Sequence, residues 1–106
     1  MKPDQHSEII QRLRCASGHL NAVIKMTESG EPCEQVLHQL NAVQAALRAT
    51  GGKLLGCQSQ ESQAIILDSP SPERRTSELK RLQSLYTTFM QYSNNHNEVN
   101  HDSNSS

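Results

Sequence analysis

The chain has 106 residues, of which 34% are hydrophobic and 3% aromatic, with no tryptophan and a formal net charge of −1. This length indicates one domain, and so few large apolar side chains suggest helices that complete their core by oligomerisation. The small net charge does not indicate nucleic-acid binding, so a DNA-binding face would need local clusters of basic residues. No segment resembles a signal peptide or a membrane span, so we expect a cytoplasmic protein whose three cysteines are thiols.

The first predicted helix runs from about residue 6 to residue 28. Apolar residues recur there at steps of three and four, which is the helical period, with Ala16 and Val23 beside the main stripe. The members of this stripe are Ile10, Leu13, Ser17, Leu20 and Ile24. The segment 28–32, Glu-Ser-Gly-Glu-Pro, interrupts the period and predicts a turn.

A second helix is predicted over residues 31–67. Its apolar stripe alternates steps of four and three, which is the heptad spacing of helices that pack along one another. The stripe consists of Val36, Leu40, Val43, Leu47, Thr50, Leu54 and Cys57. Because Leu54 and Cys57 stay in phase across Gly51 and Gly52, we expect one continuous helix. We expect the stripe to be buried between protomers, because it is a large apolar patch for a soluble monomer.

A third helix is predicted over residues 72–92, after a loop of alternating serine and proline residues. Ser71 can cap this helix, and Pro72 suits its first turn. Its apolar stripe is Leu79, Leu82, Tyr86 and Phe89. Residues 93–106 are polar and are expected to be disordered. These patterns predict an all-α protein with one domain over residues 1–92 and a polar tail.

Cys33 is the candidate functional thiol. It falls in the first turn of the second predicted helix, where unpaired N–H groups and the positive end of the helix dipole favour a thiolate. Ser29 or Gly30 can cap this helix. Cys15 and Cys57 are interpreted as small buried residues. The sequence contains no catalytic triad, phosphate-binding glycine loop or paired-carboxylate motif, so it does not indicate an enzyme.

The segments RLRCASGHLNAVIKM and ESGEPCEQVLHQLNAVQAAL resemble the CsoR/RcnR/FrmR family of metal-sensitive bacterial repressors, over about residues 8–90. The resemblance implies a three-helix protomer, an antiparallel four-helix-bundle dimer, and a disc-shaped homotetramer built from two dimers. It also implies that basic residues of the first two helices bind operator DNA, which an inducer releases. The corresponding positions here are Arg12, Arg14 and Arg48, and Lys53 is a further candidate.

The resemblance also separates the possible inducers. Copper-sensing members combine the first-turn cysteine with a histidine and a cysteine, whose positions fall on Gln58 and Ser62; these are poor ligands for monovalent copper. Persulfide-sensing members use a second cysteine at the position of Ser62. Nickel and cobalt sensors use an N-terminal amine or histidine, the cysteine and further histidines, which leaves Cys33, the N-terminal amine and His6 as candidate metal ligands. A repressor that responds to nickel, cobalt, zinc or copper stays open as an alternative, as do a helical metal-handling protein and a helical assembly module without DNA binding.

The string SGEPC around Cys33 is similar to the formaldehyde-responsive FrmR branch. In that branch one formaldehyde carbon joins the cysteine thiol to the N-terminal amine of a proline. Here the proline is Pro3, and lysine after methionine should block removal of Met1, so the corresponding amine is that of Met1 or Lys2. The resemblance therefore implies a repressor that needs no cofactor and is released when formaldehyde or another thiol-reactive small molecule acts at Cys33.

Overall fold

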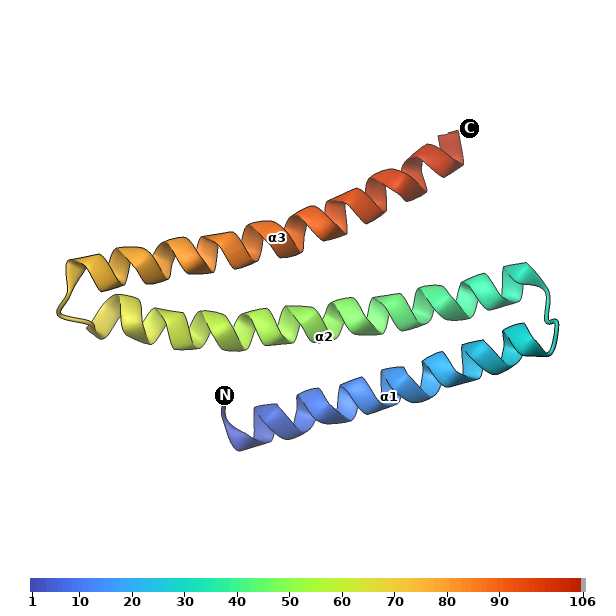
Figure 1. The fold of residues 1–106 in the computed structure, drawn as a ribbon, viewed down its shortest axis with the longest axis horizontal. Helices are drawn as coiled ribbons and strands as arrows, with labels where there is room; N and C mark the ends of the chain where they lie inside the picture. Colours follow the sequence, from blue (N-terminus) through green and yellow to red (C-terminus); the bar gives the residue numbers. More distant parts are fainter. Residues whose placement is uncertain (106) are drawn as a thin grey trace. The chain divides into compact units, whose positions relative to one another are not determined.

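The computed structural model of the chain contains three α-helices, α1 (Pro3–Glu28), α2 (Cys33–Asp68) and α3 (Pro72–Ser105) (Figure 1). It describes the backbone of residues 1–105 and the side chains of residues 1–91. Over these residues all regular secondary structure is helical, which confirms the all-α class. None of the helices, as far as they are described, combines the length and hydropathy needed to cross a membrane. The predicted disorder over residues 93–106 lies outside the described side chains and stays a prediction.

Two compact units make up the chain, Met1–Cys57 and Gln58–Ser106. The first unit holds α1 and most of α2, and the second holds the last part of α2 together with α3. α2 continues through Gly51 and Gly52, as the phase of its apolar stripe predicts. The expected single domain over residues 1–92 stays a prediction, because each unit is described by itself.

The turn after α1 is built by backbone hydrogen bonds to the last turn of that helix. The N–H of Gly30 donates to the carbonyl of Thr27 at 3.1 Å, and the N–H of Glu31 donates to the carbonyl of Met26 at 3.0 Å. This pair of bonds is a Schellman ending, and Gly30 supplies the positive φ of 75° that it requires. The expectation that Ser29 or Gly30 caps the second helix is wrong, because both residues terminate α1.

α2 begins two residues later than expected, at Cys33. The carbonyl of Pro32 accepts the N–H of Val36 at 3.1 Å, so Pro32 precedes the helix and Cys33 takes its first position. The prediction that Cys33 lies in the first turn is therefore confirmed. α1 begins three residues earlier than expected, at Pro3, because a proline loses no hydrogen bond in a first turn.

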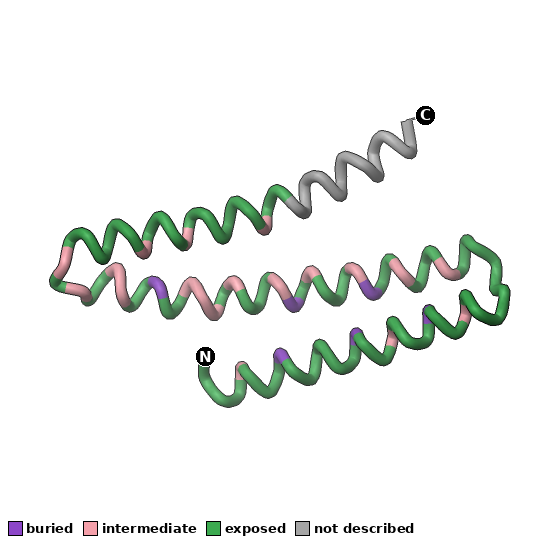
Figure 2. Tube along the Cα trace, viewed as in Figure 1, coloured by how far each residue is buried: buried purple, intermediate pink, exposed green. Residues whose placement is uncertain are grey.

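In the first unit, α1 packs on α2 through a narrow heptad face. The buried residues are Ile9, Ala16 and Val23 of α1, and Val43 and Thr50 of α2 (Figure 2). The hydroxyl of Thr50 donates to the carbonyl of Ala46 at 2.9 Å, so its burial leaves no donor unpaired. The small side chain of Ala16 allows the two helices to approach closely at the middle of this face.

The apolar stripe predicted for the first helix stays exposed in this chain. Its large members are between 36% and 46% exposed, and they are Ile10, Leu13, Leu20 and Ile24. By the 100° step per residue they lie between about 40° and about 120° around α1 from the centre of the buried set, all to the same side of it, so the stripe is turned away from the line along which α1 meets α2. The members of the apolar stripe of α2 differ in burial. Val43 and Thr50 are buried, whereas Leu47 and Leu54 are exposed. The expectation of burial between protomers is therefore wrong for Val43 and Thr50, and it stays a prediction for Leu47 and Leu54.

In the second unit, Ser71 caps α3 as predicted. Its side-chain oxygen accepts the N–H of Arg74 at 3.3 Å, and Pro72 takes the first helical position. In the predicted stripe of α3, Leu82 and Phe89 are half-buried, and Leu79 and Tyr86 are exposed.

Candidate functional site

Cys33 and the candidate amine lie at opposite ends of the first unit. Cys33 is exposed at the first position of α2. Met1 and Lys2 come directly before Pro3, at the end of α1 that is farthest from Cys33 (Figure 1). A helix of 26 residues is roughly 39 Å long, so the thiol and the amine cannot meet within one protomer. His6, one turn into α1, is also distant from Cys33. Any bridge between these groups must therefore join two chains.

The candidate metal ligands are not gathered into a site within this chain. Among the described side chains, no group of three or more His, Cys, Asp or Glu residues is placed to hold a metal ion. The histidine nearest to Cys33 in sequence is His38, whose Nε2 lies 3.8 Å from Glu34 Oε1 on the same helix. A site that uses Cys33 and His6 would have to form between protomers.

Gln58 and Ser62 belong to a hydrogen-bond chain inside the second unit. The amide of Gln58 donates to the hydroxyl of Ser62 at 3.0 Å, and this hydroxyl donates to Glu78 Oε1 at 2.7 Å. Arg81 Nη1 lies 3.5 Å from the same carboxylate oxygen. Ser62 is fully buried, and the side chain of Glu78 is only 11% exposed. The chain of bonds therefore links the end of α2 to α3 and engages both Gln58 and Ser62.

Replacing Ser62 should destabilise the fold measurably. In Ser62→Ala the largely buried Glu78 loses a donor, which should lower the free energy of unfolding by about 1–3 kcal/mol. Urea unfolding at one fixed protein concentration measures this change. Ser77→Ala, at an exposed serine of α3, is the control and should stay within about 0.5 kcal/mol of the parent. Equal effects of the two substitutions would show that the bond to Glu78 adds no stability.

Two of the four predicted DNA-binding residues meet at Glu8, in the first unit. Lys53 Nζ lies 3.2 Å from Glu8 Oε1, and Arg12 Nε lies 3.3 Å from the same oxygen. The hydrogen bond and charge of Lys53, followed by the bond to Arg12, lower the pKa of Glu8 below its ordinary value of 4.5. These ion pairs therefore stabilise the folded chain fully at a pH above the ordinary pKa of Glu8. This stabilisation is lost as the pH falls through the lowered pKa that Glu8 has in the folded chain.

The other two predicted DNA-binding residues lie elsewhere. Arg14 is exposed and follows Arg12 by two residues, which is about 200° around α1. Arg48 is half-buried on α2 and precedes Lys53 by five residues, which is about 140° around that helix. One chain therefore does not gather the four basic residues on a single face, and only an assembly of several chains could do so.

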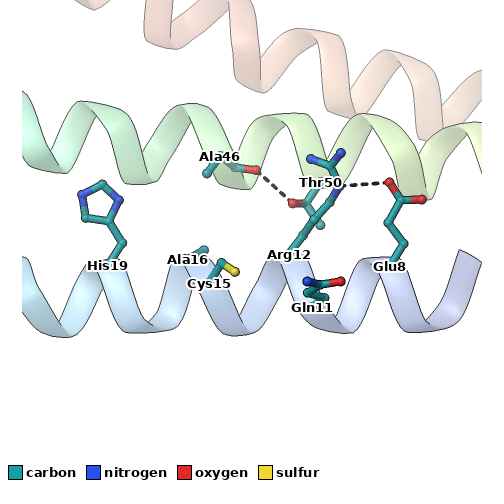
Figure 3. Close-up of a pocket in the computed structure, with 8 residues that line it drawn as sticks. All are labelled: Glu8, Gln11, Arg12, Cys15, Ala16, His19, Ala46 and Thr50. Carbon is teal, nitrogen blue, oxygen red and sulfur yellow. Dashed lines mark hydrogen bonds and ion pairs between the residues drawn. The ribbon is translucent and has the colours of Figure 1, made fainter.

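A pocket of about 400 Å³ lies beside the Glu8 ion pairs (Figure 3). It is lined by Glu8, Gln11, Arg12, Cys15, Ala16 and His19 of α1 and by Ala46 and Thr50 of α2. His19 Nε2 lies 2.8 Å from Gln39 Oε1, which adds a polar contact between the two helices.

The interpretation of Cys15 as a buried residue is wrong, because Ala16, about 100° further around α1, takes the buried position instead. Cys57 is half-buried.

The comparison with known proteins assigns the chain to a family. Residues 5–89 match the family model of the metal-sensitive transcriptional repressors. The chain belongs to the metal-sensitive transcriptional repressor family. The copper-sensing transcriptional repressor CsoR of Mycobacterium ulcerans (strain Agy99) is 38% identical to it over 52 residues, which are 49% of this chain and 44% of that protein. The matched segment thus spans less than half of that relative's length.

The fold of this family member also has a solved counterpart. A variant of the formaldehyde-responsive regulator FrmR from Salmonella enterica serovar Typhimurium superposes with a TM-score of 0.70 at 23% identity. The alignment covers 83% of this chain and 97% of that chain. This likeness shows that the chain shares the three-helix fold of that regulator.

The residues at the positions that the resemblance assigns to copper ligands do not suit monovalent copper in this chain. The resemblance places the histidine and cysteine of copper-sensing members at Gln58 and Ser62. An amide and a hydroxyl are poor ligands for monovalent copper, and both groups are engaged in the chain that leads to Glu78.

Sequence reasoning missed two acidic residues of these sites. The spacing of four between Glu8 and Arg12 is a helical ion-pair signal that could have pointed to Glu8. Its contact with Lys53 depends on the register between α1 and α2, which no local pattern reports. Glu78 carries no such signal, because its partner Ser62 is sixteen residues away on another helix.

Proposed function

We propose that this family member is a cytoplasmic, DNA-binding transcriptional repressor that leaves its operator when formaldehyde or another thiol-reactive small molecule reacts at Cys33. The observation that carries the proposal is the exposed Cys33 thiol at the first position of α2. The sulfur of a cysteine is a nucleophile that attacks a carbonyl carbon, and the exposed position of Cys33 leaves it open to a small molecule. The absence of soft ligands at Gln58 and Ser62 favours this chemistry over cuprous copper.

The proposed reaction with formaldehyde is an addition followed by loss of water. The thiolate sulfur of Cys33 bonds to the carbonyl carbon, and the oxygen takes up a proton, which gives S–CH₂–OH. An amine nitrogen then bonds to the same carbon while the hydroxyl leaves as water, which gives the methylene bridge S–CH₂–N. The candidate amine is that of Met1 or Lys2 on a second chain, since α1 separates these groups within one chain.

Such a bridge would change how two protomers are held together. It would join the start of α2 in one chain to the start of α1 in another, at a contact between protomers of the proposed dimer of dimers. An assembly with DNA-bound and released forms needs only a modest difference in the stability of these forms to shift between them. The covalent bridge supplies this difference if only the released form can accommodate it.

The basic residues lead to a prediction about DNA affinity. Arg14→Ala and Arg48→Ala should each weaken operator binding and reduce the slope of log affinity against log salt by about one, because each removes one phosphate contact. Fluorescence anisotropy of a labelled operator between about 50 and about 200 mM salt measures both quantities. Helicity and oligomeric state should match the parent. If both variants bind DNA as the parent does, these arginines do not contact DNA.

A metal-responsive repressor is the second candidate, favoured by the metal-sensitive family to which the chain belongs. It predicts stoichiometric binding of nickel, cobalt, zinc or copper that is lost in Cys33→Ala and kept in Gln58→Ala and Ser62→Ala. A metal titration of the operator complex distinguishes the two candidates, because only a metal-responsive repressor would leave the operator in that experiment. A metal-handling protein without a DNA role would bind the metal and show no salt-dependent binding of the operator.

A further inference from the structure

Glu8 holds two of the basic residues that the proposed function assigns to DNA. Lys53 reaches Glu8 Oε1 from α2 at 3.2 Å, and Arg12 reaches the same oxygen from one turn along α1 at 3.3 Å. The side chains are 43% exposed for both cations and 48% exposed for Glu8, so solvent and a DNA strand have access to them. A carboxylate oxygen shared by a lysine and an arginine is the same kind of charge-assisted contact that a backbone phosphate makes.

We propose that Glu8 is an internal competitor for DNA phosphate, which weakens the binding of this repressor to any DNA sequence. The inference rests on the proposed DNA-binding function. A phosphate that binds Lys53 or Arg12 competes with Glu8 Oε1 for these cations, and the carboxylate is itself a like charge close to the DNA. Phosphate contacts do not depend on the DNA sequence, so weakening them lowers the affinity for non-specific DNA. The contacts with bases then make a larger contribution to the choice of binding site.

A purely structural role for Glu8 is the other interpretation of these contacts. The Lys53 pair joins α1 to α2, and it could serve only to hold the two helices together. Exposed ion pairs of this kind add little stability, however, and the buried face of Ile9, Ala16 and Val23 already fixes the pairing of the helices.

The test compares Glu8→Gln with Glu28→Gln. Both substitutions remove one negative charge from an exposed residue of α1, but Glu28 lies at the opposite end of the helix. Glu8→Gln should bind the operator and an unrelated duplex roughly three- to tenfold more tightly at about 50 mM salt, and its salt slope should steepen by about one. Glu28→Gln should stay close to the parent. Glu8→Ala should reproduce the gain, since the lost charge causes it.

A double substitution shows whether the cations mediate the effect. In a Lys53→Gln background, Glu8→Gln should gain less affinity than it does in the parent, because only Arg12 is left to be freed. Circular dichroism checks that all variants keep the parent's helicity.

The outcomes separate this inference from the proposed function. A parent protein that binds no DNA at any salt concentration overturns both. A parent that binds DNA, with Glu8→Gln no tighter than Glu28→Gln, overturns the inference alone. Weaker binding by Glu8→Gln also overturns it, since Glu8 would then position the two cations for DNA.

Discussion

Cys33→Ala should bind the operator as tightly as the parent and should remain bound when formaldehyde is added. Cys33 lies at the turn between α1 and α2, away from Arg12 and Lys53, so its removal leaves two of the proposed DNA contacts unchanged. Without its sulfur the first bond of the proposed bridge cannot form. Operator anisotropy with increasing formaldehyde should therefore show release of the parent and no release of the variant.

Cys15→Ala is the demanding control for this experiment. Cys15 is also an exposed thiol, but it lies in the middle of α1 beside the pocket and not at a helix start. The variant should respond to formaldehyde as the parent does, and so should Cys57→Ala. If Cys33→Ala leaves the operator as readily as the parent, the sensing thiol has been assigned to the wrong cysteine.

Leu47→Asp should disrupt the proposed oligomer. The exposed apolar residues of α1 and the exposed Leu47 and Leu54 of α2 fall on the same side of this antiparallel pair of helices, by the 100° step per residue. A second pair of helices placed on this side would complete the proposed four-helix bundle. An unpaired aspartate at the centre of that contact costs several kcal/mol, so the variant should dissociate or lose helicity.

Size-exclusion chromatography with light scattering and circular dichroism measure this result. Leu67→Asp is the control, because Leu67 is 70% exposed on α2 and lies off the apolar stripe. This control should keep the size and helicity of the parent. A Leu47→Asp protein that also keeps both would place the contact between protomers on another surface.

Local patterns were sufficient for the helical class and for the position of Cys33. Apolar spacing at steps of three and four predicts the three helices, and its unbroken phase predicts the passage of α2 through Gly51 and Gly52. The glycine and proline of the turn predict that Cys33 lies in a first turn, although Gly30 ends α1 and does not begin α2. Such features depend on residues that are close in sequence.

These local patterns did not predict the contacts between helices. α1 carries two adjacent apolar faces, and the sequence favours the one with the larger side chains, which includes Leu13 and Leu20. The structure turns the other face, with the small Ala16 at its centre, toward α2. The ion pair of Glu8 with Lys53 and the burial of Glu78 depend in the same way on how helices are aligned. The alignment of two helices cannot be predicted from the spacing of residues in one sequence.

Peptide mapping of a formaldehyde-treated mixture of isotopically labelled and unlabelled protein tests the proposed bridge between chains most directly. Equal amounts of ¹⁵N-labelled and unlabelled repressor are unfolded together, refolded and treated with formaldehyde. We expect a bridged peptide pair, about 12 Da heavier than its two parts, that joins Cys33 to the segment containing Met1 and Lys2. Pairs with one labelled and one unlabelled partner should be present, since α1 prevents the bridge within one chain. Bridges found only between identically labelled peptides, or adducts on Cys15 with Cys33 unmodified, would contradict the proposed bridge between chains.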